Sequence, residues 1–409
     1  MWPFARSRIY LDNAAATPMC KEAARAYARA ARACGNPGST HEEGRLASEI
    51  LESSRATIAS ELAVKPREII FTSGSTEANN LAIVGLAQQL LRARGSLAQT
   101  HWIVSVIEHP SVLQSFAEVE RLGGAVTHIM PDERGLFAAE VVTRAVRPET
   151  VLVSIAWANH ELGVVQPLRA LSRALRGQAE QFGMPPPLFH TDMGQAPLYK
   201  VPHVHTLGVD LAVLGSGKLY GPRGIAALYL ANRVQLVAQS FGGGQERELR
   251  AGTESPALAA GFAAALQQAT ASRQVESKRV ASLRDSLAEA LHTVFPFSLE
   301  NTSRPDSLPH LLNISIPGAN SEYLVLALDR EGVAVSTRSA CNAGETASHV
   351  VAALGGPENR ATSTIRFSLG PLTTARDIHR AVEICSKIVS QNPHAIVASW
   401  ISSSSTNRK

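Results

Sequence analysis

The chain has 409 residues, of which 45% are hydrophobic and 18% charged, a balance that excludes a largely disordered protein. Its length predicts about two or three domains. The net charge of +4 comes from scattered basic residues without interleaved aromatics, so we predict no nucleic-acid binding. No apolar run reaches the roughly 18 residues of a membrane helix, and the first residues leave no room for the apolar core of a signal peptide, so we predict a cytoplasmic protein without membrane contact.

From about residue 68 the chain alternates short β-branched runs with stretches of helical periodicity. Helices are expected over 111–122, 167–182 and 255–268. This alternation predicts an α/β domain whose largely parallel sheet carries helices on both faces. The expected strands are Glu68–Phe71, Trp102–Val106, Ala125–Ile129, Val151–Ile155, Pro187–His190, Asp210–Leu214 and Ile225–Leu230.

A smaller α+β unit is expected after a connecting helix over 268–292. Its predicted strands and helices are Leu311–Ile316, Glu322–Asp329, Val333–Ser336, Thr364–Leu369 and Ala375–Gln391. The low-complexity end of the chain is expected to be disordered. We therefore predict an N-terminal segment, a large cofactor-binding α/β domain, a small C-terminal domain and a tail, spanning residues 1–20, 21–268, 269–400 and 401–409.

Residues whose side chains could bind a ligand or take part in catalysis follow several of the predicted strands. They lie at the edge of the sheet where open α/β folds bind ligands. A helix start rich in Ser and Thr suits a phosphate, because it offers free N–H groups and hydroxyls. A phosphate site, an aromatic ring, an acid and a lysine together suit pyridoxal 5′-phosphate (PLP), whose phosphate needs donors, whose pyridinium nitrogen needs a carboxylate and whose aldehyde needs an amine. The residues are Thr72–Thr76, Glu108, His109, Trp157–Glu161, Asp192, Gln195 and Gly215–Lys218.

Each of these features has a plainer interpretation when it is taken alone. The glycines before Lys218 suggest a P-loop, but Ala212 stands where that motif needs glycine and Leu219 where it needs Ser or Thr. A Ser/Thr-rich helix start is usually only a cap. Asp192 alone could be a turn residue, and His109 a surface or core histidine. The combination, in this order and at strand ends, favours the PLP site.

The four cysteines are far apart and form no CxxC pair, which disfavours a disulfide framework and a zinc site. This spacing leaves room for one reactive thiol. A free cysteine is usually a small buried residue, and we interpret Cys20, Cys34 and Cys385 in this way. Cys341 lies between a predicted strand and helix, beside a glycine, where a flexible segment is expected.

Together, the motifs resemble those of the cysteine desulfurases, in the class V branch of the fold-type-I PLP enzymes. The resemblance covers nearly the whole chain and implies a large, mostly parallel-sheet domain followed by a smaller α+β domain. The matching segments are Ile9–Pro18, Gly35–Pro37, Ser39–His41, Phe71–Glu77, Glu108–His109, Lys218–Pro222, Gly242–Arg247, Arg250–Thr253, Ser339–Cys341, Arg366–Gly370 and Thr373–Thr374.

The resemblance implies a role in cofactor binding for four residues around the ring. Lys218 would hold PLP as a Schiff base and later move the α-proton of the substrate. Asp192 would pair with the pyridinium nitrogen, and Gln195 would bond the ring hydroxyl. His109 would stack on the ring and assist proton transfer.

Further residues would hold the phosphate and the substrate. Ser75 and Thr76 would bind the phosphate together with Thr253 of the partner subunit, which implies a homodimer. Asn36 and Arg366 would bind the substrate carboxylate, the latter through the paired donors of its guanidinium.

The implied reaction moves sulfur from L-cysteine to Cys341. A thiolate at Cys341 would take the sulfur as a persulfide, and L-alanine would leave. The persulfide would serve iron–sulfur cluster or thio-cofactor assembly through an acceptor protein that the sequence does not name. Two alternatives stay open: a selenocysteine lyase or other class V enzyme, and a cofactor-poor scaffold in sulfur delivery.

Three departures from the family pattern surround the site. Gly217 stands where the family usually has a histidine that helps to bind the phosphate, and Ser216 would supply the missing contact. His160 replaces an asparagine that touches the ring hydroxyl. Arg338 replaces a glycine shortly before Cys341, and the loop that follows is one residue short. We predict a working cofactor site with weakened affinity.

Overall fold

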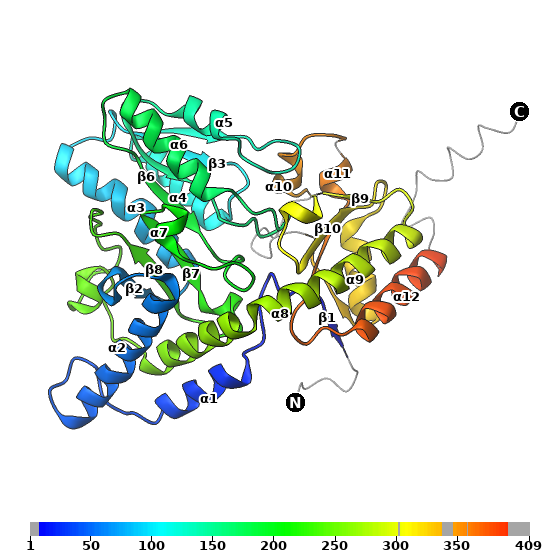
Figure 1. The fold of residues 1–409 in the computed structure, drawn as a ribbon, viewed down its shortest axis with the longest axis horizontal. Helices are drawn as coiled ribbons and strands as arrows, with labels where there is room; N and C mark the ends of the chain where they lie inside the picture. The colour runs from blue at the N-terminus through cyan, green and yellow to red at the C-terminus, as the bar shows by residue number, and fades with distance from the viewer. Residues whose placement is uncertain (1–7, 302, 338–346, 358, 392–409) are drawn as a thin grey trace, which may run out of the picture.

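The computed structural model describes residues 8–301, 303–337, 347–357 and 359–391. A seven-stranded sheet forms the centre of its larger part (Figure 1). β8 is antiparallel to both of its neighbours and all other pairs are parallel, which confirms the predicted largely parallel sheet. The strands, in spatial order, are β2 (Ile69–Thr72), β8 (Ala226–Leu230), β7 (Leu211–Gly215), β6 (Leu188–Asp192), β5 (Thr150–Ser154), β3 (His101–Ser105) and β4 (Ala125–Ile129).

Successive side chains of the central strands enter two different cores, because they point to opposite faces of the sheet. In β3, Trp102 and Val104 join one apolar cluster and Ile103 joins the other. Because helices cover both faces of the sheet, the central strands have apolar residues at successive positions. The first cluster packs against α3 (Ser75–Arg94) and α4 (Pro110–Arg121). The second packs against α2 (Glu42–Leu62), α5 (Ala139–Ala145), α6 (Leu168–Gln181) and α7 (Val204–Leu207).

One helix, α8 (Pro256–Val294), passes from the large part to the small part (Figure 1). The sequence predicts a helix and a separate connector here, whereas the structure joins them in 39 continuous residues. No Gly or Pro interrupts the segment after Gly261 until Pro296, so nothing breaks the helix. Phe262 belongs to the core of the large part and Leu287 to that of the small part. The boundary at residue 268 therefore lies inside a helix and stays a prediction.

The small part is built on an antiparallel sheet of three strands, β12 (Thr364–Ser368), β10 (Leu311–Ser315) and β9 (Leu299–Glu300). The N-terminal strand β1 (Ile9–Tyr10) pairs in parallel with β11 (Val333–Ala334), so the N-terminal segment joins this part. No helix within the described ranges is long and apolar enough to cross a membrane. The remaining helices are α1 (Lys21–Ala30), which packs on α8, and α9 (Ser321–Arg330), α10 (His349–Ala352), α11 (Asn359–Thr362) and α12 (Ala375–Gln391).

Candidate active site

The end of β6 and the loops that follow β3, β5 and β7 bring the central predicted residues together. The rings of His109 and His160 meet edge to face, with centroids 5.4 Å apart. Charges on Asp192 and Lys218 both act on His109. The sheet therefore collects these four residues at the carboxyl edge of its parallel strands, as the sequence predicts.

His109 is the residue that caps the N-terminus of α4. Its Nδ1 accepts a hydrogen bond from the Ser111 N–H at 3.1 Å, so the neutral ring carries its proton on Nε2. Burial lowers the pKa of His109 below its ordinary value; Asp192 partly opposes this, and Lys218 adds to it. The positive end of the α4 dipole also disfavours an imidazolium here. His109 is thus held as a neutral imidazole with a fixed tautomer.

Asp192 ends β6, although the sequence places it just after a shorter strand. Its Oδ1 accepts the Gly194 N–H at 2.8 Å, and its Oδ2 accepts an N–H of Asn79 at 3.0 Å. Asn79 is fully buried in α3 and also donates to Ser111 Oγ at 2.9 Å. This network fixes the carboxylate relative to His109. Sequence reasoning missed Asn79, whose only signal is its place one turn after Ser75.

Lys218 lies in a single 3-10 turn, Ser216–Lys218, directly after β7. Its Nζ donates to the carbonyls of Ala14 at 2.5 Å and Ala15 at 2.7 Å. Gln195 Nε2 donates to the same Ala14 carbonyl at 3.0 Å. The N-terminal segment therefore lies directly against the lysine and Gln195, a contact that the sequence does not predict.

The N-terminus of α3 offers an anion site close to β7. Ser75 and Thr76 are its first two residues, and Gly74 before them makes no side-chain cap. A Cβ at Gly215 would lie 2.3 Å from Ser75 Oγ, so glycine at the end of β7 makes room for that hydroxyl. Free N–H groups and a hydroxyl at a helix start fit a phosphate. With the nearby amine, carboxylate and imidazole, this donor set fits PLP.

Ser216 is fully buried, and its Oγ has no hydrogen-bond partner in the described part of the chain. A Cβ at Gly221 would lie 2.2 Å from this oxygen, whereas Gly215 is the residue that faces Ser75. The predicted phosphate contact of Ser216 stays a prediction. Thr253 and Asn36 are exposed, and no hydrogen bond within the described ranges ties either of them to the residues around Lys218. Their predicted roles stay predictions too.

Arg366 in β12 is 1% exposed and bridges the two parts of the molecule. Its Nη1 donates to the His160 carbonyl at 2.8 Å, and its Nη2 pairs with Asp12 at 2.8 Å. Its Nε has no partner among the described residues and can donate to a carboxylate. Sequence reasoning missed Asp12, which is the only acid in the matching segment Ile9–Pro18.

The Glu161 carboxylate and the Glu108 backbone connect the site to the residues that follow the predicted nucleophile. Cys341 and Arg338 themselves lie outside the described residues. Glu161 accepts a hydrogen bond from Ser348 Oγ at 2.5 Å, and the Glu108 carbonyl contacts His349 Nε2 at 3.2 Å. These contacts anchor the start of α10 beside the imidazole pair.

Burial shifts the pKa values of the titratable groups near the start of α10 and of Cys385. It raises the pKa of Glu108 to about 8, while its Oε1 accepts the Ala156 N–H at 2.8 Å. It lowers the pKa of His160 well below the ordinary value, so this ring is neutral. In α12, burial raises the pKa of the Cys385 thiol to about 12, which makes that cysteine a poor nucleophile.

Comparison with known proteins relates the whole chain to one enzyme family. Residues 9–381 match the family described as aminotransferase class-V. The cysteine desulfurase IscS of Dictyoglomus turgidum is 36% identical over 386 residues, which cover 94% of this chain and 95% of that protein. A putative cysteine desulfurase, IscS 1 of Bacillus subtilis, is 37% identical over 93% of this chain and 98% of its own.

Solved structures support the same relation. A NifS-like protein superposes with a TM-score of 0.86 at 29% identity, and the match covers 94% of this chain and 100% of the other. The likeness confirms the predicted fold, with its large and mostly parallel sheet.

Proposed function

Because the chain belongs to the class-V aminotransferase family and, within it, to the cysteine desulfurases, we propose that it is a PLP-dependent enzyme that transfers sulfur from L-cysteine to Cys341. The observation that carries this proposal is the convergence of Lys218, Asp192 and His109 at one edge of the sheet. An amine, a carboxylate and a neutral imidazole are the groups that this chemistry requires.

PLP, when bound, supplies an electron sink for the bonds around the substrate's α-carbon. Lys218 would provide the amine that holds the cofactor and would then carry the α-proton. Asp192, which accepts hydrogen bonds from Asn79 and Gly194, would pair with the ring nitrogen. His109 would stack on the ring and could exchange a proton through Nε2, since Nδ1 accepts a hydrogen bond from Ser111. Gln195 and His160 would contact the ring hydroxyl.

The substrate is held by its carboxylate through Arg366 and Asn36. The Cys341 thiolate forms a bond to the substrate sulfur while the carbon–sulfur bond breaks. One L-cysteine and one thiol thus give one L-alanine and one persulfide. The sulfur of Cys341 is oxidised as the substrate carbon is reduced, so the step needs no external oxidant.

Ser75 and Thr76 would hold the phosphate, together with Ser216 and with Thr253 from the partner subunit of a homodimer. An acceptor protein then takes the persulfide sulfur for iron–sulfur cluster or thio-cofactor assembly in the cytoplasm. These roles rest on the resemblance to the cysteine desulfurases.

Alanine formation and visible absorption test the proposal together. The purified protein should show the absorption band of lysine-bound PLP and convert L-cysteine to L-alanine. Lys218→Ala should lose both properties, whereas Lys21→Ala, an exposed lysine at the start of α1, should retain both. A Lys218→Ala protein that still shows the band and forms alanine would contradict the proposed role of Lys218.

A further inference from the structure

The backbone on either side of Lys218 is held by one hydroxyl of the N-terminal segment. Thr17 is 3% exposed, and its Oγ1 donates to the Gly217 carbonyl at 3.0 Å and accepts the Tyr220 N–H at 2.9 Å. The Thr17 N–H donates to the same Gly217 carbonyl at 3.2 Å. One threonine therefore binds the backbone groups just before and two residues after Lys218.

The turn needs such contacts because the backbone of Tyr220 is unfavourable. Its φ of 61° lies in the left-handed region, which disfavours a residue with a Cβ. The Cys20 N–H donates to the Tyr220 carbonyl at 2.8 Å, so both backbone polar groups of Tyr220 are bonded to residues 17–20. Loss of the Thr17 hydroxyl would leave the buried Tyr220 N–H without this acceptor and would favour a change of the turn.

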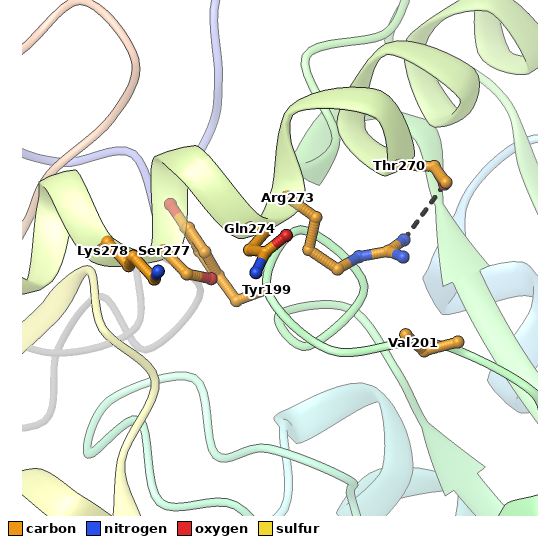
Figure 2. Close-up of a pocket in the computed structure, with 7 residues that line it drawn as sticks. All are labelled: Tyr199, Val201, Thr270, Arg273, Gln274, Ser277 and Lys278. Atoms are coloured by element: carbon orange, nitrogen blue, oxygen red, sulfur yellow. Dashed lines mark hydrogen bonds between the residues drawn. The ribbon is translucent and has the colours of Figure 1, made fainter.

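The Tyr220 side chain is tied to the same N-terminal segment. Its hydroxyl donates to Asn13 Oδ1 at 3.0 Å, and Asn13 Nδ2 donates to the Ser368 carbonyl of β12 at 2.9 Å. A Cβ at Gly370 would lie 2.4 Å from the Tyr220 hydroxyl, so glycine makes room for it. Burial raises the pKa of Tyr220 well above its ordinary value, and Tyr199, which lines a pocket along α8 (Figure 2), raises it further. The hydroxyl therefore stays a donor.

The tip of the Lys218 side chain is held by the same segment. Its Nζ donates to the carbonyls of Ala14 at 2.5 Å and Ala15 at 2.7 Å, which stand shortly before Thr17 in the chain. We infer that Thr17 is a positioning residue for Lys218: it fixes the turn relative to these two carbonyls, so that the amine is placed to react with the aldehyde of PLP. The inference rests on the proposed attachment of PLP to Lys218.

Attachment of the cofactor requires the amine to leave the two carbonyls. The Lys218 nitrogen, as a neutral amine, forms a bond to the aldehyde carbon, and the aldehyde oxygen leaves as water with the two hydrogens of the amine. If only some chains hold the amine in place, the apparent affinity for PLP falls by that fraction. Pyridoxamine 5′-phosphate carries an amine instead of the aldehyde, so its binding requires no bond to Lys218.

Titration of the cofactor-depleted, full-length protein with each compound tests the role of Thr17. Absorption of the lysine-bound form measures PLP binding, and quenching of protein fluorescence measures pyridoxamine 5′-phosphate binding. Thr17→Val should weaken PLP binding about tenfold and change the affinity for pyridoxamine 5′-phosphate less than about twofold. Thr17→Ser, which keeps the hydroxyl, should bind both compounds as the wild type does. Tyr220→Phe should weaken PLP binding alone, by about fivefold.

Thr100→Val is the matched control, because Thr100 makes the same pair of bonds just before the amino end of β3. Thr100 is buried, and its hydroxyl donates to the Leu97 carbonyl at 2.7 Å and accepts the Trp102 Nε1–H at 2.9 Å. This variant should lower the melting temperature as Thr17→Val does and leave both affinities unchanged.

Three outcomes would overturn the inference. The first is an unchanged PLP affinity in Thr17→Val or, should that variant not fold, in Tyr220→Phe. The second is an equal loss of affinity for both compounds, which would make Thr17 a support of the whole pocket. The third is the same selective loss in Thr100→Val. A wild type that never shows the band of lysine-bound PLP would contradict the proposed function itself, and this inference with it.

Discussion

At the scale of single residues, Gly217 stands where the resemblance to the cysteine desulfurases predicts a histidine. A Cβ at this position would meet Arg223 Cγ at 3.4 Å, which is ordinary contact distance. The backbone of Gly217 is not in the left-handed region that favours glycine. The structure therefore accommodates a Cβ at this position, and the turn does not require glycine.

We predict that Gly217→His strengthens PLP binding about tenfold, because one added hydrogen bond to a charged phosphate contributes about 1.5 kcal/mol. Fluorescence titration of the cofactor-depleted protein with PLP measures this. Gly177→His in α6, where a Cβ would meet nothing within 4 Å, serves as the control. An unchanged affinity would show that Gly217 does not weaken the site.

Glu108 provides a second test at this scale. Its folded-state pKa of about 8 lies above the value of about 4.3 for an exposed glutamate. Between these values the unfolded chain releases a proton that the folded chain keeps, so Glu108 lowers the stability as the pH rises. Glu108→Gln removes this dependence and keeps an acceptor for Ala156.

We therefore expect the melting temperature of Glu108→Gln to exceed that of the wild type by more at pH 8 than at pH 5. The substitution should remove a pH dependence of the free energy of unfolding of at most about 1.4 kcal/mol per pH unit. Differential scanning calorimetry across this pH range measures it. A difference that stays constant with pH would show that Glu108 titrates normally in the folded protein.

Sequence patterns predict Lys218, His109 and Asp192 as site residues because each ends or follows a recognisable strand. They did not identify Asn79, Asp12 or the role of Glu108, whose partners are distant in the chain. Asn79 and Asp192, for example, are 113 residues apart. Sequence periodicity indicates only which residues nearby in the chain share a face. Contacts between residues that are far apart in the chain are found only from the three-dimensional structure.

At the scale of elements, the strands of the large sheet agree with prediction to within one or two residues, since turns and β-branched runs mark them locally. The pairing of β1 with β11 has no local signal. The turn Gln245–Glu248 likewise has no local signal in the sequence. Its residues Glu246, Arg247 and Glu248 have φ of 46°, 58° and 63°. Such a run is unfavourable for residues with a Cβ, so other contacts must hold it.

A buried ion pair supplies those contacts. Both carboxylate oxygens of Glu246 accept from Arg55, at 2.7 and 2.8 Å, and one also accepts the Phe71 N–H of β2 at 2.7 Å. The Arg55 guanidinium lies over the Phe71 ring at 4.6 Å. The pair thus joins the turn to the strand that leads to Ser75.

We predict that Glu246→Gln destabilises the protein by about 1–3 kcal/mol, because the buried Arg55 then keeps only the exposed carboxylate of Glu52 as its ion-pair partner. The double variant with Arg55→Met should cost less than the sum of the two single changes. Glu248→Gln, in the same turn but exposed, should cost little. Chemical denaturation of the wild type and the four variants measures these costs, and additive effects of Glu246→Gln and Arg55→Met would contradict the pairing.

At the scale of the whole molecule, α8 and Arg366 connect the two parts, and the resemblance to the cysteine desulfurases predicts that a second chain completes the phosphate site. If Thr253 acts across the dimer, a Lys218→Ala chain and a Thr253→Asp chain should restore each other when mixed. Each mixed dimer then holds one intact site, so random exchange should recover about a quarter of the activity.

Alanine formation after unfolding and refolding the two variants together measures this recovery. Thr253→Ser, which keeps the hydroxyl, should remain active alone. Sedimentation should give twice the chain mass of 43.6 kDa. Activity no greater than the mean of the separate variants would place Thr253 in the site of its own chain.

The proposed reaction is tested most directly by finding which cysteine of the chain receives the sulfur. After one turnover with L-cysteine, mass spectrometry of alkylated peptides should find one additional sulfur atom on Cys341, in proportion to the alanine formed. Cys341→Ser should retain the PLP absorption band and form neither persulfide nor alanine. Additional sulfur on Cys20, Cys34 or Cys385, or full alanine production by Cys341→Ser, would contradict the proposed reaction.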